Sequence, residues 1–172
     1  MFPNQSLLEG CQIQTGFSPG ALGVAKTGTT VQMTGYGRLL VLFHKGIGTI
    51  EPPTLTLLQG KDLSMTGSKD LTFTDIWVKQ DPTRLQDIPQ WTHVTQAAGN
   101  SYADATTGPM ETLWAIDIKA TDLDINNGFC CVQASTSEVA SGDAVIGDLL
   151  YIAYDPVNST MAENMAGIVV AA

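Results

Sequence analysis

The sequence predicts an all-β protein: a single-domain β-sandwich, jelly-roll-like, with long loops and extended termini. Short segments rich in Val, Ile, Leu, Thr and aromatic residues recur along the chain, as pleated strands prefer. Gly, Pro, Asn and Asp separate these segments at short intervals. No stretch keeps the 3.6-residue apolar period of a helix for more than two turns. Many short strands with regular turn signals are typical of sandwiches, jelly rolls and barrels.

Eight segments are expected to be strands, and a ninth segment, at the C-terminal end, gives a weaker signal. The eight segments are residues 30–34, 38–45, 54–59, 71–80, 91–96, 111–119, 129–135 and 149–154, and the weaker one is 167–170. The strongest breakers between them are residues 46–48, 51–53, 81–82, 126–128 and 141–143.

The phase of the apolar residues assigns faces to some of these strands. Side chains alternate between the two faces of a strand, so Trp114, Ile116 and Ile118 share one face, which we expect to be the core face. Residues 39–43 are apolar on both faces, which predicts a central strand or one covered by a partner.

The segment 71–80 does not keep one phase. Its apolar residues are Leu71 and Phe73, followed by Ile76 and Val78, so the pattern slips by one residue near Asp75. A β-bulge at Asp75 explains the slip. An unbroken strand with a polar interruption is the alternative reading.

The domain organisation expected from the sequence is one domain over residues 1–172. Its 172 residues are close to the size of one domain and are enough to bury about 70% of the surface of the unfolded chain. Residues 81–90 and 97–109 read as long loops inside that domain. The segments 1–29 and 155–172 are expected to be extended arms, the second with an apolar tip at residues 168–170.

Composition narrows the classes of partner. Charged residues make up 15% of the chain, against about 25% in average domains, which favours a protein that lives in an assembly. The net charge is −9 and no basic run occurs, so nucleic-acid binding through phosphates is not expected. On a capsid, this charge predicts a place on the outer surface, away from the packaged genome.

The N-terminal segment and the hydropathy pattern predict neither secretion nor a membrane span. No basic region followed by an apolar stretch opens the chain, and the longest apolar run, residues 39–43, is far below the roughly 20 residues that a membrane helix needs. The cysteines Cys11, Cys130 and Cys131 are odd in number and two are adjacent. We expect free, mostly buried thiols in a reducing compartment.

Two motifs imitate ligand sites. Residues 20–30, GALGVAKTGTT, resemble a phosphate loop, but Lys26 precedes Gly28 instead of following the second glycine. Residues 122–128, DLDINNG, resemble the start of a calcium loop. Asn127 and Gln133 stand where that loop needs its Gly and its bidentate Glu, and an Asp/Asn-rich turn explains the residues without a metal.

No residue pattern predicts catalysis. The two histidines, His44 and His93, have no second ligand at metal-binding spacing, and no nucleophile elbow occurs. A cysteine–histidine pair from distant parts of the chain remains possible in principle, but a small buried thiol is the more common role. The sequence therefore predicts no catalytic residue, no cofactor-binding residue and no metal ligand, and we expect no enzyme activity and no cofactor.

Two stretches carry a resemblance to a known group of proteins. Residues 54–80 read TLTLLQGKDLSMTGSKDLTFTDIWVKQ, and residues 116–154 place Asp122-Leu123-Asp124 before Gly128-Phe129 and end in a Leu-Tyr-Ile strand. This pattern is similar to a loose family of phage and prophage structural proteins encoded among head genes. Departures are Gly60, where the family has Gln or Ala, and Cys130-Cys131, where aromatic or β-branched residues are common.

The resemblance implies a virion role and transfers no functional residue. We expect a capsid decoration or cement protein on the outer surface of the head, assembled in the host cytoplasm, whose partners are the major capsid protein and further copies of itself. A trimer is the favoured homo-oligomer, because a capsid offers three-fold positions and closed cyclic symmetry is the default. The alternative is a tail-associated or carbohydrate- or receptor-binding sandwich. Such a module needs a concave face with exposed Trp or Tyr, and Trp91 with Tyr102 in loop-like surroundings is the only hint of one.

Overall fold

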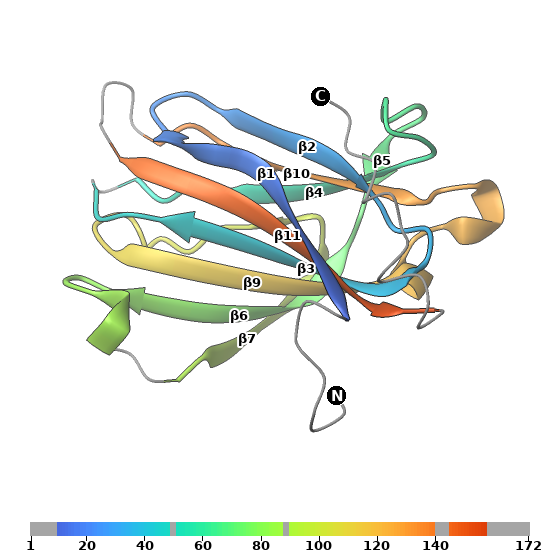
Figure 1. The fold of residues 1–172 in the computed structure, drawn as a ribbon. Helices are drawn as coiled ribbons and strands as arrows, with labels where there is room; N and C mark the ends of the chain where they lie inside the picture. The colour runs from blue at the N-terminus through green and yellow to red at the C-terminus, as the bar shows by residue number, and fades with distance from the viewer. Residues whose placement is uncertain (1–9, 49–50, 88–89, 140–144, 158–172) are drawn as a thin grey trace.

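The computed structural model describes residues 10–48, 51–87, 90–139 and 145–157 of the chain. Its strands form two antiparallel sheets that pack face to face (Figure 1). The larger sheet has the strand order β1 (Cys11–Ala21), β11 (Ile146–Pro156), β3 (Tyr36–Lys45), β9 (Glu111–Lys119), β6 (Phe73–Asp81), β7 (Thr92–Gly99). The smaller sheet has the order β2 (Lys26–Gln32), β10 (Cys131–Thr136), β4 (Leu55–Gly60), β5 (Lys69–Asp70), and β8 (Ser101–Tyr102) also pairs with β4.

Helical structure in the described residues is confined to three short 3₁₀ turns. These are η2 (Leu85–Asp87), η3 (Ala120–Asp122) and η4 (Ile125–Asn127). The predicted all-β sandwich is therefore confirmed. The jelly-roll connectivity stays a prediction.

The core lies between the sheets and follows the alternation of the strands. Trp114, Ile116 and Ile118 on β9 are 0%, 0% and 1% exposed, which confirms the predicted core face. On β3, Leu39, Val41 and Phe43 point into the same core while their neighbours point outward. Strand β3 lies between β11 and β9, so the prediction of a central strand from residues 39–43 is confirmed.

The predicted phase slip in the segment 71–80 is also present. Phe73 and Ile76 are both buried although they are three positions apart, an odd spacing that alternation would place on opposite faces. The pairing of β6 with β7 shifts register between Phe73 and Asp75. Because of this shift, Trp77 points to the outer face of the sheet and is 42% exposed.

The prediction of an extended N-terminal arm over residues 1–29 is wrong at residues 11–21 and 26–29, and residues 1–9 lie outside the described residues. Residues 11–21 form β1, which pairs with β11 along its whole length, and β2 begins at Lys26. The sequence of β1 does not show the pattern of a strand, because it contains Gly16, Pro19 and Gly20. Its pairing with β11 is also shifted in register twice. As an edge strand it needs few apolar residues.

At the C-terminal side, β11 runs to Pro156, two residues beyond the predicted strand end at Tyr154. The segment 158–172, with the weak expected strand 167–170 and the apolar tip 168–170, lies outside the described residues. Residues 97–99 belong to β7, whereas we expected a loop there.

Candidate functional site

On the outer face of the larger sheet, apolar side chains occupy positions that normally contact water. Antiparallel sheets packed on one side usually alternate apolar inward and polar outward residues. Here the outward positions in the middle of the three central strands are aliphatic, and Leu42 stands between Leu150 on β11 and Ala115 on β9. We call this set the apolar stripe: the half-buried Leu40, Leu42, Leu113, Leu150 and Ile152, together with Ala115, which lies opposite Trp77 and is 4% exposed.

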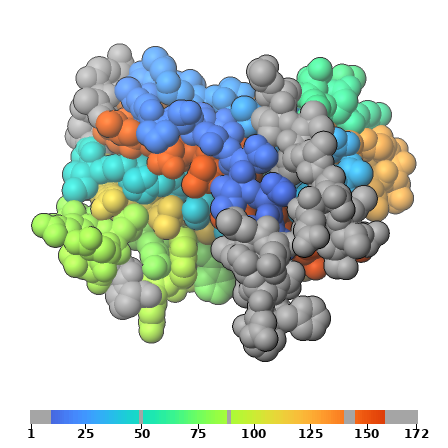
Figure 2. Space-filling view, viewed as in Figure 1, coloured from blue at the N-terminus to red at the C-terminus, as the bar shows by residue number. Residues whose placement is uncertain are grey.

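Edge strand β1 extends the apolar stripe on one side. Ile13 lies opposite Ile152 and is 47% exposed. Figure 2 shows β1, β11 and β3 side by side on the face toward the viewer, with the β6–β7 hairpin below them. Aliphatic side chains in contiguous outward positions indicate a surface that another protein segment covers.

A charged cluster closes one end of the apolar stripe. Arg38 binds the Asp117 carboxylate with two nitrogens, one of them through Nε at 3.1 Å, and the pair is half-buried. The Tyr154 hydroxyl donates to Asp117 Oδ2 at 2.7 Å and accepts from Arg38 Nε at 2.8 Å. Burial and the neighbouring carboxylate raise the pKa of Tyr154, so it remains a neutral donor. This cluster fixes Asp117 in one orientation.

A second cluster closes the other end. His44 on β3 lies between two carboxylates: its Nδ1 is 2.9 Å from Asp148 Oδ1 and its Nε2 is 3.3 Å from Glu111 Oε1. Glu111 also accepts the backbone N–H of Leu85 at 3.0 Å. No sequence spacing links these residues, because the carboxylates come from neighbouring strands far apart in the chain.

A cleft opens between β6 and β9, where their pairing ends. The ladder runs from Asp81 opposite Glu111 to Trp77 opposite Ala115, and beyond that point β6 pairs only with β7. The resulting wedge cleft has a volume of about 230 Å³. Its polar lining consists of Thr72, Thr74, Asp75, Asp117, Lys119 and Asp122.

Trp77 follows the cleft-lining residue Asp75 by two positions on β6, at the point where the pairing of β6 with β9 ends. It stacks on His93 of β7 with ring centroids 4.5 Å apart, and His93 Nε2 lies 2.7 Å from Asp75 Oδ1. The Thr74 hydroxyl donates to the other oxygen of Asp75 at 2.5 Å. These hydrogen bonds, the one from Thr74 first, lower the pKa of Asp75, so the carboxylate stays ionised.

A second tryptophan lies on the same hairpin. Trp91 comes just before β7, is 39% exposed, and has the Lys79 ammonium 5.1 Å from its ring centroid. The expected pair of Trp91 with Tyr102 does not form a surface. Tyr102 is 7% exposed and packs edge-on against Trp114 in the core, with centroids 4.8 Å apart.

The predicted Asp/Asn turn at residues 122–128 is present. Asp122 accepts the backbone N–H of Lys119, and Asp124 accepts two hydrogen bonds from the side-chain nitrogen of Asn127 and pairs with Lys69. Gly128 closes the turn with a positive φ of 83°. Among the described residues, no group of three or more His, Cys, Asp or Glu side chains is arranged to hold a metal.

The segment that imitates a phosphate loop is the connection between two strands. Residues 20–21 end β1 and residues 26–30 belong to β2. No helix follows them, and a phosphate loop presents its backbone N–H groups at the start of a helix.

The three cysteines are free thiols. Cys11 and Cys131 are buried, as expected, and burial raises the pKa of Cys131 to about 12. Cys130 is partly exposed, and its sulfur lies 3.7 Å from that of Cys131. Strand alternation does not separate these two side chains, because β10 begins only at Cys131.

A buried lysine is a feature that sequence reasoning missed. Lys45 is 0% exposed, and its ammonium donates to the backbone carbonyls of Gly46 (3.1 Å), Thr107 (3.1 Å), Gly108 (2.8 Å) and Met110 (2.8 Å). Burial lowers its pKa to about 8. The signal was in the sequence, since Lys45 continues the inward phase of Leu39, Val41 and Phe43.

Comparison with known proteins does not assign the chain to a family. No protein-family model and no curated protein matches the chain. A solved structure, the prophage-derived protein YomS of SPBc2, is similar with 13% sequence identity and a TM-score of 0.43 over 83% of this chain and 93% of that one. Within the described residues, no helix has the length and hydropathy to cross a membrane.

Proposed function

We propose that the protein is a non-enzymatic virion structural protein, a decoration or cement protein on the outer surface of a phage head. The observation that carries the proposal is the apolar stripe. Aliphatic side chains on the outer face are expected in a protein that packs on its neighbours, and not in a sandwich whose outer face contacts only water. The side chains concerned are Leu40, Leu42, Leu150 and Ile152.

The partners in this proposal are the major capsid protein and further copies of the chain, with a trimer as the favoured oligomer. The resemblance of residues 54–80 and 116–154 to head-region proteins supports a place on the head. The net charge of −9 supports an outward location, because it disfavours contact with packaged DNA.

The mechanism in this proposal is burial of surface across several shell subunits. Two packed sheets provide a rigid body, and the apolar stripe provides contact area at about 25 cal/mol for each Å² removed from water. The Arg38–Asp117 cluster at one end and the His44 cluster at the other are polar rims that orient the contact. Repetition over many equivalent positions makes a modest contact decisive for the shell.

Sedimentation with undecorated capsids tests the proposal. We expect the wild-type protein to co-sediment with the shells, and Leu42→Lys to lose most of this binding because it places a charge in the middle of the apolar stripe. Leu58→Lys is the matched control: Leu58 is a half-buried leucine at an outward position of β4, in the other sheet. Circular dichroism verifies that both variants fold.

Two outcomes contradict the proposal in different ways. Equal binding by the wild type and Leu42→Lys removes the apolar stripe from the contact. No binding by the wild type to any head shell argues for a tail-associated or receptor-binding role instead.

A further inference from the structure

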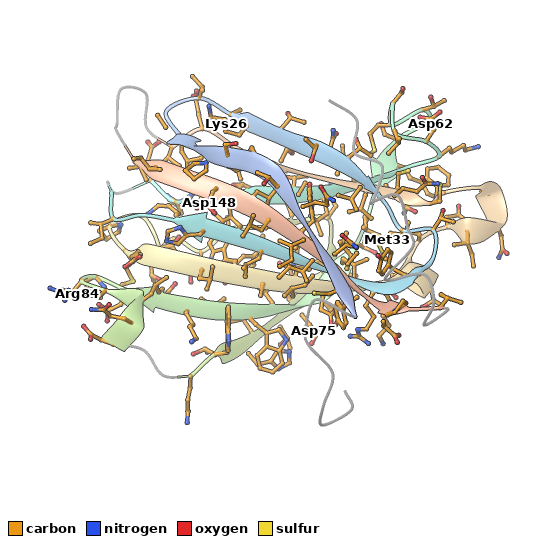
Figure 3. All side chains as sticks on the ribbon, in the orientation of Figure 1. Lys26, Met33, Asp62, Asp75, Arg84 and Asp148 are labelled. Atoms are coloured by element: carbon orange, nitrogen blue, oxygen red, sulfur yellow. The ribbon has the colours of Figure 1, made fainter. Side chains whose placement is uncertain are left out.

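We infer that the wedge cleft and the two tryptophans beside it form a binding site for neutral carbohydrate. This site shares Asp117 with the charged cluster at the end of the apolar stripe, but it differs from the stripe in its chemistry and goes beyond a role in shell stabilisation. Figure 3 labels Asp75 at the lower side of the molecule, on the edge hairpin, and Asp148 toward the left end of the sheet, so the cleft lies apart from the His44 cluster.

The first argument is the aromatic platform. Trp77 and Trp91 are both exposed on the outer face of one hairpin, at 42% and 39%. His93 lies opposite Trp77 on the neighbouring strand. Lys79 follows Trp77 by two residues on β6, about 7 Å further along the strand, and its ammonium lies over the Trp91 ring. A pyranose ring presents C–H groups on its flat faces, and these pack on an exposed indole. Two indoles in a row suit an oligosaccharide better than a single sugar.

The second argument is the fixed orientation of the platform. The stack of His93 on Trp77 and the hydrogen bond from His93 to Asp75 hold the indole, the imidazole and the carboxylate as one unit. A site whose side chains are already ordered loses little conformational entropy on binding. A free surface tryptophan would have neither contact.

The third argument is the polar lining of the wedge cleft. Asp75 and Asp117 accept hydrogen bonds, and carboxylates make short, strong ones with hydroxyl donors. Each retains acceptor capacity: within the described part of the chain, Asp75 Oδ1 takes only His93, and Asp117 Oδ1 takes only a long bond of 3.3 Å from Arg38. The hydroxyls of Thr72 and Thr74 line the same space. A polyol supplies the donors that this lining needs.

The charge of the cleft selects the class of carbohydrate. Three carboxylates, of Asp75, Asp117 and Asp122, line the cleft with one lysine, Lys119, and Arg38 is ion-paired to Asp117, which leaves one negative charge in excess. This excess of negative charge disfavours phosphate, sialic acid and uronic acid, and it leaves neutral sugars. The cleft volume of about 230 Å³ is below that of drug-sized pockets, so we expect it to take one ring while the next rings lie over the tryptophans.

Titration of the full-length protein tests this inference. The probes are chitohexaose and cellohexaose, two neutral β-1,4-linked oligomers with flat apolar faces, and oligogalacturonate serves as the anionic comparison. We expect tryptophan fluorescence and calorimetry to report saturable binding of at least one neutral probe and none of the anionic one. Trp77→Ala and Trp91→Ala should each weaken binding about tenfold or more.

Matched variants make the result specific. Ile125→Ala removes an exposed apolar side chain from η4, where it is 59% exposed, and should leave binding unchanged. Asp75→Asn keeps the shape of the cleft but removes one of its three carboxylate charges, and should weaken the neutral probe while reducing the rejection of the anionic one.

Two results overturn the inference. One is the absence of saturation by both neutral probes up to about 10 mM, near the weak limit of specific binding. The other is equal affinity in the wild type and both tryptophan variants. If, in addition, Trp77→Ala abolishes sedimentation with capsids, the platform is a protein interface. Failure of the carbohydrate titration alone leaves the role of the apolar stripe intact, since that role is measured by sedimentation of Leu42→Lys.

Discussion

The hydroxyl of Tyr151 accepts a hydrogen bond from the backbone N–H of Ala134 at 2.8 Å, across the interior from one sheet to the other. Tyr151 lies on β11 in the larger sheet and Ala134 on β10 in the smaller one. The N–H is available because the pairing of β10 with β2 shifts register between Gln133 and Ser135. A bulge in one sheet is thus satisfied by a side chain of the other.

We expect Tyr151→Phe to destabilise the protein by about 1–3 kcal/mol. The ring still fills its place, but the Ala134 N–H loses its partner in a dry environment. Urea denaturation of the wild type and the variant measures the difference. A change below about 0.5 kcal/mol would mean that the N–H finds another acceptor.

Gly28→Ala is expected to be more harmful than an ordinary glycine substitution in a strand. A Cβ at this position would lie 2.8 Å from both the Ala134 carbonyl oxygen and the Tyr151 hydroxyl, and 2.9 Å from a methyl of Leu149. Overpacking of this kind costs about 1–3 kcal/mol. Gly99→Ala is the control, because its Cβ would meet nothing closer than 3.6 Å. Equal melting temperatures for the two variants would contradict the prediction.

Trp114→Ala should cost about 3–5 kcal/mol. The indole is fully buried, 5.5 Å from the Phe43 ring and 4.8 Å from the Tyr102 ring, so truncation leaves a large cavity. Trp114→Phe should cost much less, because the indole nitrogen has no hydrogen-bond partner among the described residues. Equilibrium unfolding checks both, and a loss below about 1 kcal/mol for Trp114→Ala would show that the site collapses.

Lys45→Met should destabilise the protein by about 2–4 kcal/mol at neutral pH, since four backbone carbonyls lose their donor. The cost should also depend on pH. Burial lowers the pKa of Lys45 from 10.5 to about 8, so between these values the unfolded chain binds more protons than the folded one. Wild-type stability then rises with pH relative to the variant.

The measurement is the difference in unfolding free energy between the wild type and Lys45→Met at pH 7, 8, 9 and 10. It should be flat below pH 8 and grow above it. A difference that shrinks with pH would mean that the carbonyls stabilise the ammonium more than burial penalises it.

Chelation by EDTA should leave the melting temperature unchanged. The turn at residues 122–128 is closed by hydrogen bonds from Asn127 to Asp124 and by the ion pair of Asp124 with Lys69, so its carboxylates already have partners. A clear drop in melting temperature that calcium reverses would show that these oxygens bind a metal.

Patterns of apolar alternation predicted the parts of the fold that depend on burial. The core face of Trp114, the central place of residues 39–43 and the slip near Asp75 all follow from which positions must avoid water. Strand β1 was not predicted, because an edge strand buries few side chains and this one contains Gly16 and Pro19. Its position is determined by the hydrogen bonds of β11, which no local pattern reveals.

The candidate sites depended on contacts between distant residues and were harder to predict. Asp75 and His93 meet because β6 and β7 pair, and Asp75 and Asp117 line one cleft because the pairing of β6 with β9 ends at Trp77. Neither relation has a fixed spacing in the sequence. The same is true of His44, whose two carboxylate neighbours come from β9 and β11.

The pairing of β1 with β11 determines how the sandwich responds to mechanical load. Cys11, at the start of β1, stands opposite Tyr154, near the end of β11, so the chain enters and leaves this strand pair at the same end. A force that pulls the two chain ends apart therefore breaks the hydrogen bonds of the pair one after another, as a zipper opens. A force across the sheet faces instead compresses two packed layers, which resist as a unit because protein interiors are close-packed. The sandwich is therefore weaker against a pull on the ends of this strand pair than against a load on its faces.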